Sequence, residues 1–468
     1  MNLNMRSLLI FLLCGSFLLS CSTPQTKKVS YHSDDPWNLD IKVEKVVLKN
    51  GLTILLVENH TLPIFSLYTF FDVGSKYERK GITGSSHFLE HLMFKGAKKY
   101  GPGVFEKAIE TNGGSSNAYT TMDQTVYYEN MPTKAIDLII DMEADRLENL
   151  LLEPKGFESE RSVILEERKY RYENSPGGQL LLATTQAMFD GTPYGESVIG
   201  RIPDLKKVSR DEIHTYFKTH YAPNNAVVVI VGDIMTHEVA HLMKTKFGGI
   251  AKSKTLEAMK RDLDDAFLYK DRAKYKKSHN IYGESPNPVF RLAYRGEPLG
   301  TRRSLVLDLL SSMLGDGKSS YLHQKYATGK KAMAGNIYAY NYNLQEAGSF
   351  FIGGQLLSGT SLKSFERKLK KETKTICKKA LNERALQKTK NQYLVSYYNS
   401  LQTNDGVAWF LGANESVFGD YNTYKKELKI YRSIQLAEVE EVCHSVFDGG
   451  KNIFLSVWNK NPKHRRKF

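Results

Sequence analysis

Two histidines and a glutamate lie within five consecutive residues of this 468-residue chain, and their spacing suits metal chemistry. The segment reads His87-Phe-Leu-Glu90-His91, and residues four apart on a helix lie on one face. His87 and His91 could therefore direct their imidazoles to one point, and imidazole is a good zinc ligand. Glu90 would stand beside them, where a carboxylate that does not bind the metal can take a proton from metal-bound water. Catalytic zinc usually has three protein ligands, so a third residue is required.

The order of these residues, H-x-x-E-H, resembles the pitrilysin and insulinase family of zinc metallopeptidases. That family includes the mitochondrial processing peptidases and paired bacterial processing-like subunits. The surrounding run, Gly84-Ser-Ser-His-Phe-Leu-Glu-His-Leu-Met-Phe-Lys-Gly96, is similar to the family's metal-binding helix almost residue for residue. The resemblance covers most of the chain from about Val43 onward, and it is looser in the second half. It implies one zinc ion per chain and hydrolysis of peptide bonds.

The third ligand in this family is a glutamate about 76 residues past the second histidine, with another glutamate seven residues before it. Here Glu167 lies 76 residues beyond His91, and Glu160 lies seven residues before Glu167. The resemblance therefore implies Glu167 as the third ligand, with the adjacent Glu166 as its rival. It makes Glu160 a catalytic-site carboxylate that supports a ligand or handles protons. The alternative for Glu160 is an exposed helix carboxylate paired with Arg161 or a lysine.

A segment that follows Gly113-Gly114 resembles the family's edge strand, which pairs with the substrate backbone. The resemblance implies that Asn117, Ala118 and Tyr119 bind substrate, with Asn117 facing the scissile region. Strand addition reads main chain rather than side chains, which suits an enzyme that takes extended peptides. An ordinary β-strand after a glycine turn would explain the same residues without function.

The second half departs from the family at one point. Many members complete the site with an Arg and a Tyr seven residues apart, after the stretch that reads here Leu314-Gly-Asp-Gly-Lys-Ser-Ser-Tyr-Leu322. Counted from Leu322, those positions fall on Ala327 and Ala334, whose side chains donate no hydrogen bond. Four other residues could supply such groups, although their spacing argues for none of them: Arg302, Tyr326, Tyr338 and Tyr340. Because paired bacterial members divide the zinc motif and the Arg and Tyr between two subunits, we expect this chain to be the zinc-bearing subunit of a heterodimer.

The elements around these motifs predict an α+β protein. Asn50-Gly51 between two apolar runs indicates a hairpin, and Pro63 to Phe71 reads as another strand. In the first half, helical periodicity covers 85–95, 104–111, 133–150, 157–172 and 210–221, and strand patterns cover 115–121, 125–131 and 226–231. The order repeats in outline after about residue 280, with strands at 289–294, 332–340, 348–354 and 452–458 and helices over 302–314 and 362–398. We therefore predict two similar domains, each a mainly antiparallel sheet with helices packed on one face. The resemblance implies that they form half of a clamp.

The N-terminal residues read as an export signal. Arg6 precedes an apolar run from Leu8 to Leu19, and about twelve residues are too few to span a bilayer, which needs about twenty. Leu18-Leu-Ser-Cys21 then resembles the lipobox of bacterial lipoproteins, in which the cysteine becomes the lipidated first residue. We expect a lipid anchor on Cys21 that holds the body in the bacterial cell envelope, on the periplasmic side of the outer membrane. The alternative is an ordinary signal with an accidental cysteine.

The domain boundaries follow from these patterns. We expect a lipoprotein signal over 1–20, a flexible tether over 21–43, a zinc-binding catalytic domain over 44–249, a charged linker over 250–280 and a second, non-zinc-binding domain over 281–468. Once the signal is removed, Cys377 and Cys443 remain as thiols, and the sequence does not decide whether they pair.

The composition is that of a globular protein. With 41% hydrophobic and 25% charged residues, the chain is neither a polytopic membrane protein nor a wholly disordered one. The net charge of +14 permits an anionic membrane, an acidic partner or nucleic acid. We find no helix-turn-helix, RNP-like or paired-cysteine finger pattern, so nucleic acid is not expected as a partner.

The functional prediction is a zinc metalloendopeptidase of the cell envelope that acts on extended peptides or unfolded proteins. One alternative is a non-catalytic assembly or peptide-binding subunit with the same fold, although such a subunit would have no need of Glu90. Another is an envelope protein whose basic surface binds polyanions, with the two histidines incidental.

Overall fold

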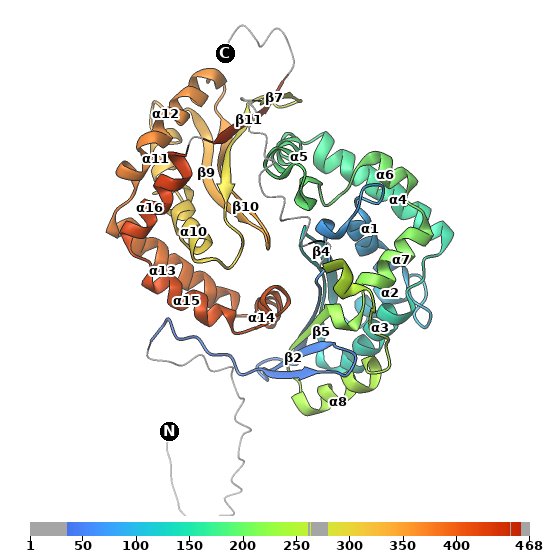
Figure 1. The fold of residues 1–468 in the computed structure, drawn as a ribbon. Helices are drawn as coiled ribbons and strands as arrows, with labels where there is room; N and C mark the ends of the chain where they lie inside the picture. The colour runs from blue at the N-terminus through green and yellow to red at the C-terminus, as the bar shows by residue number, and fades with distance from the viewer. Residues whose placement is uncertain (1–34, 261–262, 264–278, 450, 460–468) are drawn as a thin grey trace, which may run out of the picture.

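The computed structural model describes residues 35–260, 263, 279–449 and 451–459. The signal segment with Cys21, most of the tether and much of the expected linker lie outside these residues. In the part that is described, every helix is too short or too polar to cross a membrane. Two sheets line the inner side of a ring-like arrangement, and most helices lie outside them (Figure 1).

Sheet 1, in the first half, has six strands in the order β1-β2-β6-β3-β5-β4. Their bounds are β1 Glu44–Val47, β2 Thr53–Glu58, β3 Ile64–Phe71, β4 Ser115–Thr120, β5 Thr125–Pro132 and β6 Ala226–Gly232. Neighbours are antiparallel except β2 and β6, which are parallel. The expected hairpin joins β1 to β2, and Gly51 in its turn has a positive φ of 93°. β4 forms one edge of the sheet.

The outer face of sheet 1 is covered by helices of the same half. They are α1 Ser85–Leu92, α2 Val104–Thr111, α3 Ile136–Asn149, α4 Pro154–Arg168, α6 Ile202–Lys207, α7 Arg210–His220 and α8 Thr236–Phe247. The core between helices and sheet is apolar, with Phe88, Ile139 and Ile164 fully buried. Two predicted helices differ at their ends. The α-helix expected over 85–95 ends at Leu92 in a 3-10 turn, and α4 continues into a π turn, Lys169–Glu173.

Sheet 2, in the second half, has five strands in the order β7-β11-β8-β10-β9. Their bounds are β7 His279–Tyr282, β8 Val289–Gly296, β9 Ala334–Asn343, β10 Gly348–Leu356 and β11 Asn452–Trp458. Its outer helices are α10 Arg302–Gly315, α11 Tyr321–Tyr326, α12 Leu362–Ala380, α13 Glu383–Ser400, α15 Thr423–Ser433 and α16 Leu436–Phe447. The order matches β2-β6-β3-β5-β4 of sheet 1, including the one parallel pair. The predicted fold class is therefore confirmed.

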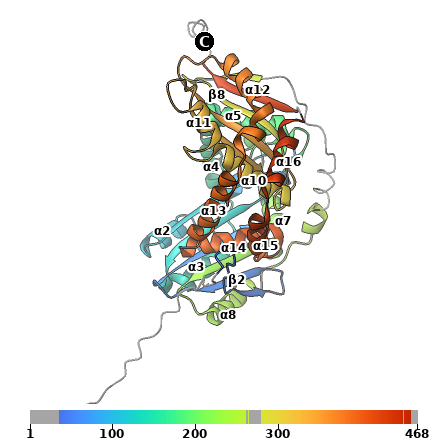
Figure 2. The same cartoon turned by 90° about the vertical axis from the view of Figure 1, so that its left-hand side faces the viewer.

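Each half also sends one helix to the other half's sheet. α5, Pro176–Phe189, packs against β8 and β11 of sheet 2, where Leu180 and Met188 join an apolar cluster with Leu455. α14, Asn404–Phe418, packs against β3 and β6 of sheet 1 through Val407 and Leu411. In Figures 1 and 2 these helices lie at the junctions between the halves. The second face of each sheet thus receives a helix that the sequence did not predict.

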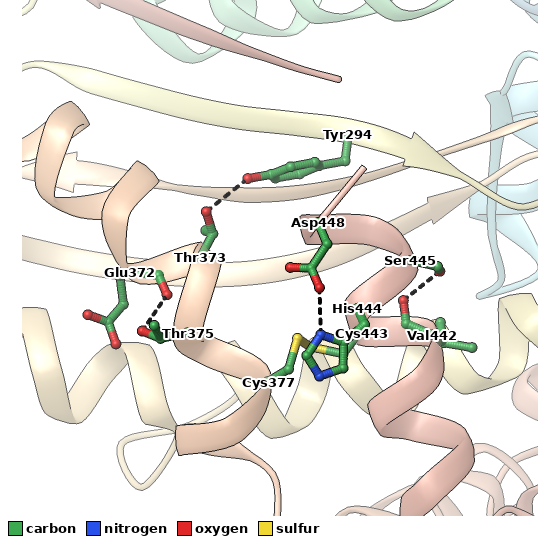
Figure 3. The surroundings of a disulfide bond; sticks show 10 residues. All are labelled: Tyr294, Glu372, Thr373, Thr375, Cys377, Val442, Cys443, His444, Ser445 and Asp448. Atoms are coloured by element: carbon green, nitrogen blue, oxygen red, sulfur yellow. Dashed lines mark hydrogen bonds and ion pairs between the residues drawn. A yellow bond between two sulfur atoms is a disulfide. The ribbon is translucent and has the colours of Figure 1, made fainter. Parts of the chain in front are cut away.

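A disulfide joins two outer helices of the second half. Cys377 on α12 bonds to Cys443 on α16, with their Cα atoms 5.8 Å apart (Figure 3). Both cysteines are buried in the apolar core of that half. The pairing that the sequence left open is therefore present.

Candidate metal centre

Helix α1 is held at its N-terminus by a partly buried glutamate. Glu78 accepts hydrogen bonds from the backbone N–H groups of Gly84, at 2.6 Å, and Ser86, at 2.8 Å. An oxygen acceptor at this position satisfies N–H groups that have no partner within the helix. Burial raises the pKa of Glu78 to about 8, while the two N–H groups act in the opposite direction. These contacts fix the helix that carries both histidines.

Three side chains from α1 and α4 converge as the sequence predicts. His87, His91 and Glu167 each offer a ligand atom, and these atoms all lie within 4.8 Å of one another. Oε2 of Glu167 lies 3.5 Å from Nε2 of His87 and 3.4 Å from Nε2 of His91. Two donors about 2.05 Å from one tetrahedral zinc ion would lie about 3.4 Å apart. The two histidine–glutamate distances therefore match this metal.

The surroundings of the three side chains shift their pKa values in different directions. Burial, together with the nearby His91 ring, lowers the pKa of His87 to about 4, which keeps its imidazole neutral as a ligand must be. The hydrogen bond with His91 lowers the pKa of Glu167 and keeps it ionised. Burial lowers the pKa of His91, but its bonds to Glu167 and Glu160 outweigh burial and raise it. The neighbouring carboxylates thus favour the protonated form of His91, and a metal competes with that proton.

Glu160 is buried and orients His91. Its Oε2 lies 3.1 Å from Nδ1 of His91, and its Oε1 forms an ion pair with Lys95 at 2.8 Å. A carboxylate on one ring nitrogen fixes the tautomer and leaves the other nitrogen for a metal. The exposed pairing with Arg161 is wrong for Glu160, because Arg161 instead bonds to Glu158. The geometry favours support of a ligand over direct proton handling.

The two candidates for the third ligand, Glu166 and Glu167, differ in exposure and in the direction of their side chains. The side chain of Glu166 is 76% exposed and lies near Lys169, whereas that of Glu167 is 16% exposed and faces the histidines. The second oxygen of Glu167 forms an ion pair with Arg171, at 3.0 Å, in the π turn that follows α4. Of the two, Glu167 therefore fits the metal position.

Glu90 lies beside the ligands and contacts the edge strand. Its Oε2 accepts a hydrogen bond from the hydroxyl of Thr120 at the end of β4. Its other oxygen accepts no hydrogen bond within the described part of the chain. Burial raises the pKa of Glu90, and the Thr120 bond acts in the opposite direction. A carboxylate with a raised pKa and one open oxygen is suited to exchange a proton.

The predicted substrate residues lie on β4, with their side chains alternating between the faces of sheet 1. Ala118 packs on the same side as Thr120, toward α1. Asn117 and Tyr119 therefore point to the opposite side, where the Tyr119 hydroxyl accepts a hydrogen bond from Trp409 of α14 at 2.8 Å. β4 pairs with β5 alone among the described strands, so no described strand occupies its other edge. The Asn117 side chain accepts a hydrogen bond from the backbone N–H of Ala118 at 2.9 Å, which a pairing peptide would displace. The strand is placed to pair with an extended peptide.

Four residues of the second half are candidates to donate hydrogen bonds to the site: Arg302, Tyr326, Tyr338 and Tyr340. Within the described residues, none of them forms a hydrogen bond or ion pair with α1. Ala327 directly follows α11, and Ala334 begins β9. Arg302 is bound to Glu438 on the outer helices, and Tyr326 is buried in the core of the second half. Tyr338 and Tyr340 lie on β9 and are partly exposed. The positions filled by Arg and Tyr in many family members therefore carry no donor here.

Sequence reasoning did not find several residues that build the centre. Glu78, Lys95, Thr120 and Arg171 touch the ligands or their helix, yet none has a distinctive spacing in the chain. Of these residues, Thr120 would have been the easiest to predict, because it follows directly after Asn117, Ala118 and Tyr119 at the end of the same strand.

The centre and fold define a two-halved α+β protein with an inverted metal motif, and comparisons with known proteins agree. The model described as "Insulinase (Peptidase family M16)" matches residues 53–201, and the one described as "Peptidase M16 inactive domain" matches residues 207–393. The chain belongs to the insulinase family, peptidase family M16.

Relatives and solved structures span most of the molecule. The zinc protease PqqE of Helicobacter pylori is 28% identical over 384 residues, which cover 81% of this chain and 83% of the relative. The probable mitochondrial-processing peptidase subunit beta of Arabidopsis thaliana is 28% identical over 312 residues, or 65% of this chain and 57% of that protein. The crystal structure of a protease from Helicobacter pylori has a TM-score of 0.79 at 24% identity, covering 89% of this chain and 99% of that one. That last likeness shows the shared fold.

Proposed function

We propose that this protein is a zinc-dependent metalloendopeptidase that cleaves extended peptides or unfolded proteins. The observation that carries the proposal is the convergence of His87, His91 and Glu167, with Glu90 beside them and tied to the edge strand. The naming of relatives as zinc proteases supports it. A non-catalytic assembly subunit would not need Glu90 in this position.

His87, His91 and Glu167 would hold the zinc ion, and Glu160 would keep His91 in the required tautomer. Zinc, when bound, lowers the pKa of a coordinated water and polarises a carbonyl group. Glu90 takes the proton of the attacking water on its open oxygen and passes it to the leaving amine. The hydrogen bond from Thr120 holds the Glu90 carboxylate next to β4. The group that transfers the proton is therefore positioned relative to the substrate backbone that would pair with this strand.

The open edge of β4 would bind the substrate as an added strand. Backbone pairing along Asn117, Ala118 and Tyr119 positions the peptide without demanding a particular side chain. Because Thr120 continues the same strand, pairing would bring the scissile bond to Glu90. This arrangement supports extended peptides rather than folded proteins as substrates.

We further propose that the chain works as the zinc-bearing subunit of a heterodimer and is lipid-anchored through Cys21 in the bacterial cell envelope. The alanines at 327 and 334 leave donors to be supplied by a homologous partner. The name of the Arabidopsis relative, a subunit beta, accords with such an assembly. The Cys377–Cys443 disulfide accords with an oxidising compartment, since disulfides persist there.

The test is Glu90→Gln, assayed with and without the protein that co-purifies with the chain. We expect retained zinc and a loss of peptide hydrolysis of about a thousandfold, because general acid–base catalysis contributes about 10² to 10⁴. Unchanged hydrolysis would contradict the mechanism, and absence of zinc after zinc loading would favour the polyanion-binding alternative. Cys21→Ser should release the body from the membrane fraction.

A further inference from the structure

The inner face of sheet 2 carries an arginine that has no carboxylate partner within the described residues. Arg291 lies in β8, and its neighbours Phe290 and Leu292 point to the opposite face, into the apolar core. Its guanidinium carbon lies 4.1 Å from the ring centroid of Phe351. Its Nε is buried and finds no hydrogen-bond acceptor in the part of the chain that is described. Arg291 as a whole is half-buried, and a partly desolvated cation without a counter-charge is a candidate to bind an anionic ligand.

A tyrosine lies next to this arginine because a glycine separates them. The strand register pairs Arg291 with Gly353 and Gly353 with Tyr338, so the three residues form one row across β8, β10 and β9. A Cβ atom on Gly353 would lie 3.0 Å from Cζ and from the hydroxyl oxygen of Tyr338, so the tyrosine ring lies across the glycine. Burial lowers the pKa of Arg291, and the nearby Tyr338 hydroxyl acts in the opposite direction. The row therefore places guanidinium N–H groups and a phenol together.

This row lies on the same sheet face as the residues that meet the substrate strand. Tyr342 lies four residues after Tyr338 on β9 and therefore on the same face of the sheet. Its hydroxyl lies 3.7 Å from Sδ of Met122. The backbone N–H of Gln345 donates to Asp123 at 3.2 Å. Met122 and Asp123 lie in the turn that follows β4, so this turn meets the C-terminal end of β9. Tyr338 remains 36% exposed, so the β9 end of the row is accessible.

We propose that Arg291 and Tyr338 form a carboxylate-binding subsite for the peptide substrate. The planar guanidinium matches a carboxylate with two parallel hydrogen bonds, and the phenol adds a third donor. The carboxylate belongs either to an acidic side chain or to the C-terminus of the peptide. The proposal rests on the proposed function for a peptide as ligand. It concerns recognition of the bound substrate, so it does not replace the donors missing at Ala327 and Ala334.

The test is calorimetric binding of three unstructured dodecapeptides to the zinc-loaded Glu90→Gln chain, which would not cleave them. One peptide has a central Glu and an amidated C-terminus, the second replaces Glu with Gln, and the third has Gln with a free C-terminal carboxylate. We expect the first or the third to bind about tenfold more tightly than the second, because a charge-assisted hydrogen bond contributes about that much. The first result assigns a side chain, and the third assigns the C-terminus.

Arg291→Gln in the same background should remove this preference, and Tyr338→Phe should reduce it about threefold. Arg302→Gln is the matched control, since it removes the same charge from an arginine paired with Glu438 on the outer helices. If Arg291→Gln does not fold, Arg291→Lys keeps the charge but loses the planar fork, and most of the preference should be lost.

Equal binding of the three peptides, or binding of none, overturns the subsite, as does a preference that survives Arg291→Gln. Cleavage by the parent chain is measured separately. If the parent chain cleaves peptides but the Glu90→Gln chain shows no tighter binding of those with a carboxylate, the subsite is overturned and the proposed function stands. An Arg291-dependent preference without cleavage would overturn only the proposed function.

Discussion

In both halves, a carboxylate on the first α-helix after the central strand contacts the edge strand of its own sheet. In the first half, Glu90 of α1 accepts a hydrogen bond from Thr120 of β4. In the second half, Asp308 of α10 accepts a hydrogen bond from Asn341 of β9 at 2.9 Å. Tyr431 of α15 donates to the other oxygen of Asp308 at 3.0 Å, so both oxygens are occupied. The scaffolds match, but Glu90 keeps an open oxygen beside two imidazoles.

The difference shows that the repeated fold does not decide where chemistry can occur. α1 carries two histidines and receives Glu167 from α4, whereas α10 carries apolar residues and three serines around Asp308. The second half is instead cross-linked through Cys377 and Cys443. One half has the features of a reactive centre and the other those of a structural support, and substitutions in each should have distinct effects.

The largest effect should come from the third ligand of the metal. We expect Glu167→Gln to weaken zinc binding about a thousandfold, because structural zinc sites derive about 10 to 16 kcal/mol from four ligands. Glu166→Gln is the matched control. The side chain of Glu166 is exposed and lies near Lys169, so this substitution should leave zinc affinity unchanged. Competition with a chelator measures both constants. Equal losses of zinc affinity in the two variants would contradict the assignment of Glu167 as a metal ligand.

The next effect tests the second half as a structural support. Removing the disulfide with Cys377→Ala and Cys443→Ala should lower the free energy of unfolding by about 3 to 4 kcal/mol, because the bond closes a loop of 66 residues in the unfolded chain. Urea unfolding under oxidising conditions measures the loss. Zinc affinity should stay within about twofold of the parent value, since no disulfide atom contacts α1. A large loss of zinc would show that the halves are not separable in this way.

A smaller effect is expected from the carboxylate behind His91. Glu160→Gln keeps the shape of the side chain but removes the charge that fixes the imidazole. Zinc affinity should fall about 10- to 100-fold, which is typical for loss of such a partner. The pH dependence of zinc binding distinguishes this role from simple loss of packing. Glu160 also raises the pKa of His91, so the loss of zinc affinity in the variant should be largest at high pH and should narrow at low pH, where a proton competes for His91 more strongly in the parent. An affinity equal to that of the parent would exclude this role for Glu160.

Local patterns predicted much of this fold. The Asn50-Gly51 hairpin and the strand over 452–458 lie where the sequence placed them, since turn chemistry and strand patterns act over a few residues. The exchanged helices α5 and α14 were missed because the sheet that each one covers belongs to the other half. β7 was missed because four residues give too short a pattern.

The centre was predictable where spacing along one helix, or a family resemblance, specified it. His87, Glu90 and His91 follow from helix geometry, and Glu167 from its distance to His91. Thr120 touches Glu90 through the packing of β4 against α1, a contact between residues thirty positions apart. Arg291 and Tyr338 are joined only through the strand register at Gly353. Such contacts are set by tertiary structure, which no local pattern encodes.

The smallest effect concerns Asp308, the counterpart of Glu90. Burial raises the pKa of Asp308 from 3.8 to about 6. A carboxyl with a raised pKa in the folded state binds its proton more tightly there, so protonation stabilises the fold at low pH, and this contribution is lost as pH rises through about 6. Asp308→Asn cannot titrate. Relative to that variant, the parent should lose about 1 kcal/mol of unfolding free energy between pH 5 and pH 7.5, measured by urea unfolding. Peptide hydrolysis should be unchanged, unlike in Glu90→Gln. Loss of activity in Asp308→Asn would break the comparison, because the second carboxylate would then share the role of the first.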